Sequence, residues 1–167
     1  MSVICGKVYP ELGKIVMASD SIIVRGDMKE NTNYSKMQRI NDMIIGGTGY
    51  CYELSLMFHF ARTHQPLDCT EKDVLDFIVE FCKWKKELNG EFELRNAYLL
   101  CYKYKLFVIN NIEAREIKDY YAIGAGDPYA TAALYLGKEP NEAVKTACDL
   151  SCYVAEPIVV DEYKMWN

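Results

Sequence analysis

The chain has 167 residues, of which 50% are hydrophobic and 26% charged, and this balance predicts one domain over residues 1–167 with a substantial core. Lys and Arg total 19 and Asp and Glu total 24, so the formal net charge is −5, which argues against nucleic acid or an anionic membrane as the main partner. The first residues lack a basic stretch followed by a long apolar one, and no apolar run approaches the roughly 18 residues of a membrane span.

The first part of the chain is predicted to be β-structure. Residues 2–9 (SVICGKVY) and 14–20 (KIVMASD) are typical of strands, and the Pro and Gly in residues 10–13 indicate the turn between them. Residues 21–33 are polar and contain glycine, so we expect a loop there. Two short strands, 34–40 and 43–47, follow around the turn signal Asn41-Asp42.

Two helices are predicted next. Apolar residues recur at helical spacing in residues 50–63, and Thr70 begins a capping-box-like TEKD for a second helix that ends at Asn89-Gly90. Three strands (94–103, 106–110 and 115–118), a third helix from Asp127, a fourth helix over about 141–154 and a last strand over 157–163 follow.

The helices therefore come in consecutive pairs between groups of strands. This order argues against a doubly wound parallel sheet, in which helices and strands alternate one by one. It favours an α/β (α+β) fold with two antiparallel sheets stacked face to face and a helix pair on each outer side, which is a four-layer αββα sandwich.

The seven cysteines are interpreted as reduced core thiols. Their number is odd, no pair has CxxC spacing, and most lie in apolar runs, which is typical of a cytoplasmic protein. Cys148 and Cys152 have the spacing of one helix face, but no histidine lies near them to complete a zinc site. His59 and His64 are expected at the surface or in a helix cap, so we expect no metal site.

Three groups of residues, in order along the chain, resemble one known family. They are Ala18-Ser19-Asp20-Ser21; residues 35–40 (SKMQRI) with 46–49 (GGTG); and residues 121–130 (YAIGAGDPYA) with 148–153 (CDLSCY). Together these motifs are similar to the proteasome β-subunit and HslV-like group of N-terminal nucleophile (Ntn) hydrolases, and the similarity spans nearly the whole chain. The resemblance implies the same αββα sandwich.

The resemblance also implies a catalytic site. After loss of Met1, Ser2 would be the nucleophile and its own α-amino group, with a pKa of roughly 7.7–8.0, the general base. Lys36 would ease loss of the hydroxyl proton, and Asp20, which lies 16 residues earlier, would hold Lys36. Gly49 is the first choice and Gly46 the second for the backbone N–H groups that stabilise the oxyanion.

The chain departs from the family pattern at two positions. The usual nucleophile is threonine, and Ser2 lacks the methyl group that restricts the threonine rotamer. Many members have Gly-Ser-Gly where this chain has Ala125 between two glycines, so a supporting hydroxyl is missing. Asp149 agrees with the HslV-like pattern and is expected to contact residues of the site rather than the substrate. A less favoured alternative makes Cys5, followed by Gly6, the nucleophile after loss of four residues, as in amidotransferases of the same broad fold.

The resemblance implies a threonine/serine-type endopeptidase that cleaves peptides or unfolded proteins without a metal or organic cofactor. It implies a ring homo-oligomer and an AAA+ ATP-driven unfoldase as partner. The alternative is a non-catalytic ring or scaffold subunit of the same fold. Ala125 and the serine in place of threonine favour that alternative, whereas Asp20 and Lys36 have no obvious use in a pure scaffold.

Overall fold

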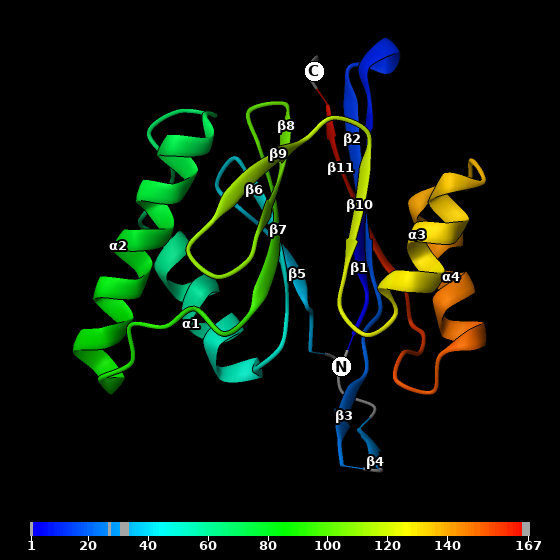
Figure 1. The fold of residues 1–167 in the computed structure, drawn as a ribbon, viewed down its shortest axis with the longest axis horizontal. Coiled ribbons are helices and arrows are strands. Elements are labelled where there is room, and N and C mark those ends of the chain that lie inside the picture. Colours follow the sequence, from blue (N-terminus) through cyan, green and yellow to red (C-terminus); the bar gives the residue numbers. More distant parts are fainter. Residues whose placement is uncertain (1, 27, 31–33, 165–167) are drawn as a thin grey trace.

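The computed structural model describes residues 2–26, 28–30 and 34–164, and within them the chain folds into four layers (Figure 1). Two antiparallel sheets lie face to face, with helices α1 and α2 outside one sheet and α3 and α4 outside the other. The predicted αββα sandwich of two antiparallel sheets between helix pairs is confirmed. None of the helices in the described residues is both long and apolar enough to cross a membrane.

The first sheet has the strand order β10-β1-β2-β11 and the second the order β5-β6-β7-β8-β9, while β3 and β4 form a separate hairpin. The bounds are β1 Ile4–Tyr9, β2 Lys14–Ser19, β3 Ile23–Arg25, β4 Met28–Glu30, β5 Met37–Ile40, β6 Met43–Thr48, β7 Ala97–Tyr102, β8 Lys105–Ile109, β9 Ala114–Ile117, β10 Tyr120–Ile123 and β11 Val159–Lys164. The helices are α1 Cys51–Ala61, α2 Glu71–Asn89, α3 Asp127–Tyr135 and α4 Pro140–Leu150, with a 3₁₀ turn at Pro10–Leu12.

Alternation along the strands builds the core. In β1, Ile4 faces the apolar layer between the sheets, whereas Cys5 faces the layer under α3 and α4. In β8, Leu106 faces the layer between the sheets and Phe107 the layer under α1 and α2. Successive residues of a strand point to opposite faces, so each sheet separates two apolar layers.

Helix α2 begins at the predicted Thr70 cap and ends at the predicted Asn89-Gly90 stop. The Thr70 side chain accepts a hydrogen bond from the Asp73 backbone N–H, and Gly90 ends the helix at φ 79°, a conformation that glycine adopts without steric cost.

Three expectations about elements were wrong. The loop expected over 21–33 contains β3 and β4, because Ile23 and Val24 favour extended backbone and Gly26, at φ 64°, allows the turn between the strands; residues 27 and 31–33 lie outside the described part. Residues 120–123 were not predicted as a strand, yet β10 pairs with β1. Helix α4 ends at Leu150 rather than near 154, so Cys148 and Cys152 do not share a helix face.

Candidate active site

A buried ion pair joins the two sheets near the start of the chain. Asp20 directly follows β2, and Lys36 directly precedes β5. The Lys36 Nζ lies 2.8 Å from Asp20 Oδ2, and the two side chains are 5% and 0% exposed, respectively. The fold therefore brings together the two charged residues that the sequence singled out.

Asp20 also binds the backbone next to Ser2. Its Oδ1 accepts a hydrogen bond from the Val3 N–H at 2.9 Å, and the Asp20 N–H donates to the Val3 carbonyl at 3.2 Å. The backbone N–H of Ile22 is a further donor to the carboxylate. One aspartate thus fixes both the lysine and the residue that follows Ser2.

Burial perturbs the protonation of both charged groups. Loss of solvent raises the pKa of Asp20 above its ordinary value, and the nearby Lys36 opposes that rise. Burial lowers the pKa of Lys36, and Asp20 opposes that fall. The Lys36 ammonium consequently holds its proton less tightly than an exposed lysine does.

Ser2 lies at the end of this network and is 5% exposed. Its carbonyl oxygen accepts a hydrogen bond from the Gly126 N–H at 3.1 Å. Gly124 has φ 97°, and a Cβ added there would lie 2.3 Å from the same Ser2 oxygen. The loop that follows β10 therefore supports Ser2 by close backbone contact. Met1 lies outside the described residues, and its removal stays a prediction.

The two glycines predicted as oxyanion donors differ in position. Gly46 lies within β6, paired with Met37 of β5 on one side and Leu99 of β7 on the other, so its backbone belongs to the sheet ladder. Gly49 follows the end of β6, is exposed and has φ 131°. No group in the described part of the chain accepts a hydrogen bond from the Gly49 N–H. Of the two, Gly49 therefore has the N–H group that is not engaged by the described residues, and Gly46 belongs to β6.

Within the described residues, the remaining predicted positions make no hydrogen bond or ion pair with Lys36 or Asp20. Ala125 is exposed in the loop between β10 and α3, and it brings no hydroxyl to the site. Asp149 is exposed on α4, and within the described residues its carboxylate is held by Lys145 at 2.8 Å. Cys5 lies buried in β1 under α4, where burial raises the pKa of its thiol to about 12, so it is unsuited to be a nucleophile.

Sequence reasoning missed two sets of polar residues. The hydroxyls of Ser19 and Ser21, on either side of Asp20, are buried without a hydrogen-bond partner among the described residues. Glu53, Lys85 and Asn96 form a second buried polar network, beside Gly49. The signal for Lys85 was present in the sequence, because it continues the apolar face of α2 four residues after Phe81.

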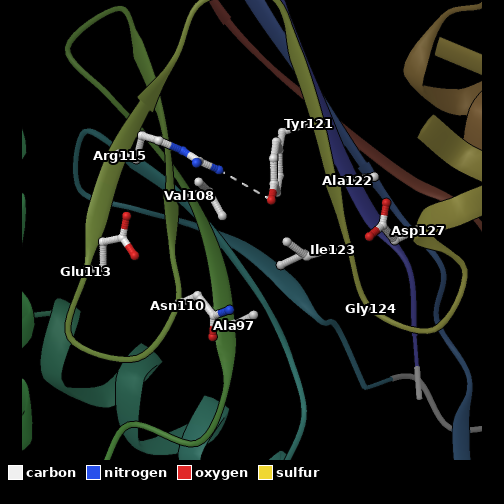
Figure 2. Close-up of a pocket in the computed structure, with 10 residues that line it drawn as sticks. All are labelled: Ala97, Val108, Asn110, Glu113, Arg115, Tyr121, Ala122, Ile123, Gly124 and Asp127. Carbon is white, nitrogen blue, oxygen red and sulfur yellow. Dashed lines mark hydrogen bonds between the residues drawn. The ribbon is translucent and has the colours of Figure 1, made fainter. Parts of the chain in front are cut away.

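A pocket of about 240 Å³ opens between β10 on one sheet and β8 and β9 on the other (Figure 2). Val108 and Ile123 give it apolar walls, and Figure 2 shows the Arg115 guanidinium pointing to the Tyr121 hydroxyl, 3.5 Å away. Gly124 lies at the edge of the pocket, which thus adjoins the loop that supports Ser2. Among the described residues, no group of three or more His, Cys, Asp or Glu is placed to hold a metal ion.

Comparison with known proteins identifies the fold. No protein-family model and no curated protein matches the sequence. Solved structures that it resembles include "Thiobacillus denitrificans BPH in complex with Epoxomicin" (TM-score 0.81, 20% identity, covering 97% of this chain and 98% of that one) and "Thiobacillus denitrificans BPH" (TM-score 0.83, 19% identity, covering 98% of each). A third is "eukaryotic HslV from Trypanosoma brucei" (TM-score 0.71, 21% identity, covering 97% of this chain and 99% of that one). Over nearly its whole length the chain therefore has the fold that HslV has.

Proposed function

We propose that this chain is an Ntn-type peptidase of the proteasome and HslV-like group. One observation carries the proposal: the buried Lys36–Asp20 pair, closed at 2.8 Å, is hydrogen-bonded at 2.9 Å to the residue directly after Ser2. That link sets the charged pair directly beside the start of the chain, where the proposed nucleophile lies. The fold shared with HslV supports the same assignment.

The proposed reaction begins once Met1 is removed. The Ser2 Oγ attacks the peptide carbonyl carbon, and the neutral α-amino group of Ser2 takes the hydroxyl proton. The positive charge of Lys36, held by Asp20, favours the developing alkoxide. The carbonyl oxygen becomes an oxyanion that accepts a hydrogen bond from the Gly49 N–H.

The remaining steps need no group from outside the chain except water. The C–N bond breaks, the leaving amine takes the proton from the α-ammonium, and an ester to Ser2 remains. Water attacks this ester while the α-amine again takes the proton, which releases the carboxylic acid product and restores Ser2. This chemistry uses only groups of the chain and water.

The first test is the intact mass of untagged protein made in cells, together with hydrolysis of small fluorogenic peptides. We expect a mass short of one methionine and turnover that Ser2→Ala abolishes. Ser2→Thr, which keeps the hydroxyl, is the matched control and should retain turnover. Epoxomicin, which is bound to one of the structural neighbours, serves as a probe that should inhibit the parent protein. Retention of Met1, or turnover unaffected by Ser2→Ala, would contradict the proposal.

A non-catalytic scaffold subunit is the second candidate. Two observations favour it: Ala125 supplies no hydroxyl, and the Asp149 carboxylate bonds to Lys145 and not to Lys36. A protein that lacks Met1, folds and still shows no Ser2-dependent turnover would establish this alternative.

We further propose that the chain forms a cytoplasmic ring homo-oligomer, served by an AAA+ ATP-driven unfoldase. A ring would enclose the site and limit cleavage to unfolded chains or peptides. Native mass spectrometry of the purified protein is expected to show one dominant multimer. A spectrum that contains only monomer over the micromolar range would exclude the ring.

A further inference from the structure

We propose that Asn96, held in place by the buried Glu53–Lys85 pair, positions the Gly49–Tyr50 turn so that the Gly49 N–H meets the oxyanion. Asn96 is a positioning residue here, because it touches the backbone of the turn and not the reacting atoms. The inference rests on the proposed peptidase function.

Asn96 holds the turn at two points. Its Oδ1 accepts a hydrogen bond from the Tyr50 N–H at 2.6 Å, and its Nδ2 donates to the Tyr50 carbonyl at 2.9 Å. The asparagine is 1% exposed, so water does not compete for these contacts. A Cβ added to Gly49 would lie 2.3 Å from the same Oδ1, which leaves room only for glycine. These two hydrogen bonds from Asn96 to Tyr50, which we call the Asn96 clamp, therefore fix the peptide group next to the proposed donor.

Glu53 in turn holds Asn96. Its Oε1 accepts hydrogen bonds from the Asn96 N–H at 2.8 Å and from the Tyr98 hydroxyl at 3.1 Å. Its Oε2 lies 2.6 Å from the Lys85 Nζ, and both charged side chains are 0% exposed. Lys85 also donates to the Glu93 carbonyl. Every member of this network has partners, which is the condition for a buried polar network to define one rigid arrangement.

The network joins α1, α2 and the segments next to β6 and β7. Glu53 lies in the first turn of α1, Asn96 directly precedes β7, and the Gly49–Tyr50 turn follows β6. A buried ion pair contributes little stability compared with apolar packing, because the charges lose their hydration. A role in fixing the position of Asn96 and the Gly49–Tyr50 turn accounts better for the presence of the Glu53–Lys85 pair. An oxyanion donor acts only when it is held in place before the reaction, and the clamp provides that restraint.

The test compares Asn96→Ala with Asn41→Gly. Asn41 is the matched control, because its Nδ2 caps the Ala61 carbonyl at 2.9 Å at the far end of α1, and glycine suits its φ of 52°. We expect Asn96→Ala to lower kcat by roughly 10–100-fold with KM changed by less than about threefold. Asn41→Gly should leave kcat within about twofold of the parent value. Asn96→Ser, which cannot span both contacts, serves if Asn96→Ala does not fold.

A pair of inhibitors separates positioning from a general structural role. In a peptide aldehyde, the Ser2 Oγ adds to the carbonyl carbon and the aldehyde oxygen occupies the oxyanion position, whereas the matched peptide alcohol forms no such bond. Asn96→Ala should weaken aldehyde binding in parallel with kcat/KM and leave alcohol binding unchanged. Equal weakening of both inhibitors would overturn the positioning role.

Amide hydrogen exchange supplies a readout that does not need activity. Exchange in the segment 48–52 should become faster in Asn96→Ala and stay at the parent rate in Asn41→Gly. Unchanged exchange and unchanged kcat would overturn the inference while the peptidase proposal stands. A parent protein without Ser2-dependent turnover would overturn the proposed function, and with it the catalytic meaning of the clamp, even if exchange responds.

Discussion

Two buried lysines of this protein are each paired with a carboxylate, but the pairs lie in different places. Lys36 and Asp20 connect the two sheets beside Ser2, and Lys85 of α2 pairs with Glu53 of α1. Removing one partner of such a pair leaves a buried charge without compensation, whereas removing both charges does not. This difference allows stability and activity to be measured separately at the proposed site.

We expect Asp20→Asn to reduce the free energy of unfolding by about 3–5 kcal/mol, because the Lys36 ammonium loses its buried counter-charge. Peptide turnover should fall to background in the same variant. The double variant Asp20→Asn/Lys36→Met should regain most of the stability and none of the turnover. Urea denaturation and fluorogenic peptide hydrolysis measure the two properties. Turnover in the double variant would show that the pair is structural.

Gly124 offers a second test at the level of one residue. Gly124→Ala places a methyl group 2.3 Å from the Ser2 carbonyl oxygen and should displace Ser2, lowering kcat/KM by about 100-fold. Gly137→Ala is the matched control, because Gly137 has a similar φ of 85° but nothing within 4 Å of the added Cβ. Gly137→Ala should lose about 1–2 kcal/mol of stability to left-handed backbone strain, and Gly124→Ala should lose more, because the clash with the Ser2 carbonyl adds to that strain. Equal turnover in the two would remove Gly124 from the support of Ser2.

The sequence could indicate residues of the site only where a motif carried them. Asp20 and Lys36 were identified by family resemblance, and the structure brings them together. Glu53 and Asn96 carried no such motif, because a single polar residue within or between apolar segments does not reveal its partner. Their contacts span 43 residues of sequence, and only the packing of α1 against the start of β7 creates them.

At the level of elements, those with strong local sequence signals could be predicted. Those that form through pairing with a distant segment could not. The cap of α2 at Thr70 is local chemistry and could be predicted. Strand β10 was missed because its partner, β1, lies more than a hundred residues earlier in the chain. The short run Tyr120–Ile123 contains β-favouring residues, but its pairing with β1 is what fixes it as a strand.

Helix α4 provides a pH-dependent test. Its capping box includes Glu142, whose pKa is lowered by the hydrogen bond from the Glu139 backbone N–H and then by Lys138. Because the pKa of Glu142 is lower in the folded state than its ordinary value of 4.5, the ionised carboxylate stabilises the fold fully at a pH above 4.5. This contribution is lost as the pH falls through the folded-state pKa. The Tm of the parent should therefore exceed that of Glu142→Gln at pH 6, and the two should converge near pH 3.

Glu80→Gln, on the exposed face of α2, is the control for the removal of one negative charge. Its Tm difference from the parent should be the smaller of the two at pH 6. A gap between the parent and Glu142→Gln that stays constant from pH 6 to pH 3 would show that the capping carboxylate is not the titrating group.

At the scale of the whole molecule, the order of elements predicted the architecture better than any single segment did. Helices in consecutive pairs indicated two antiparallel sheets, and the solved structures that share the fold cover almost the entire chain at about one-fifth identity. Sequence order could not indicate how closely the sheets approach. That depends on small residues at contact points: Gly6 in β1 lies under Leu106 of β8, and Gly46 in β6 lies under Ile4.

The contact between Gly6 and Leu106 can be tested by a double-mutant cycle. A Cβ at Gly6 would lie 2.9 Å from a Leu106 methyl group, so Gly6→Ala should reduce the free energy of unfolding by about 1–3 kcal/mol through overpacking between the sheets. Leu106→Val shortens the opposing side chain and should recover part of that loss, giving a coupling energy of about 0.5–1 kcal/mol. Ile109→Val is the control on the same strand, because Ile109 faces the helices instead. It should show no coupling to Gly6→Ala in urea denaturation, and equal coupling at both positions would contradict a direct contact across the sheets.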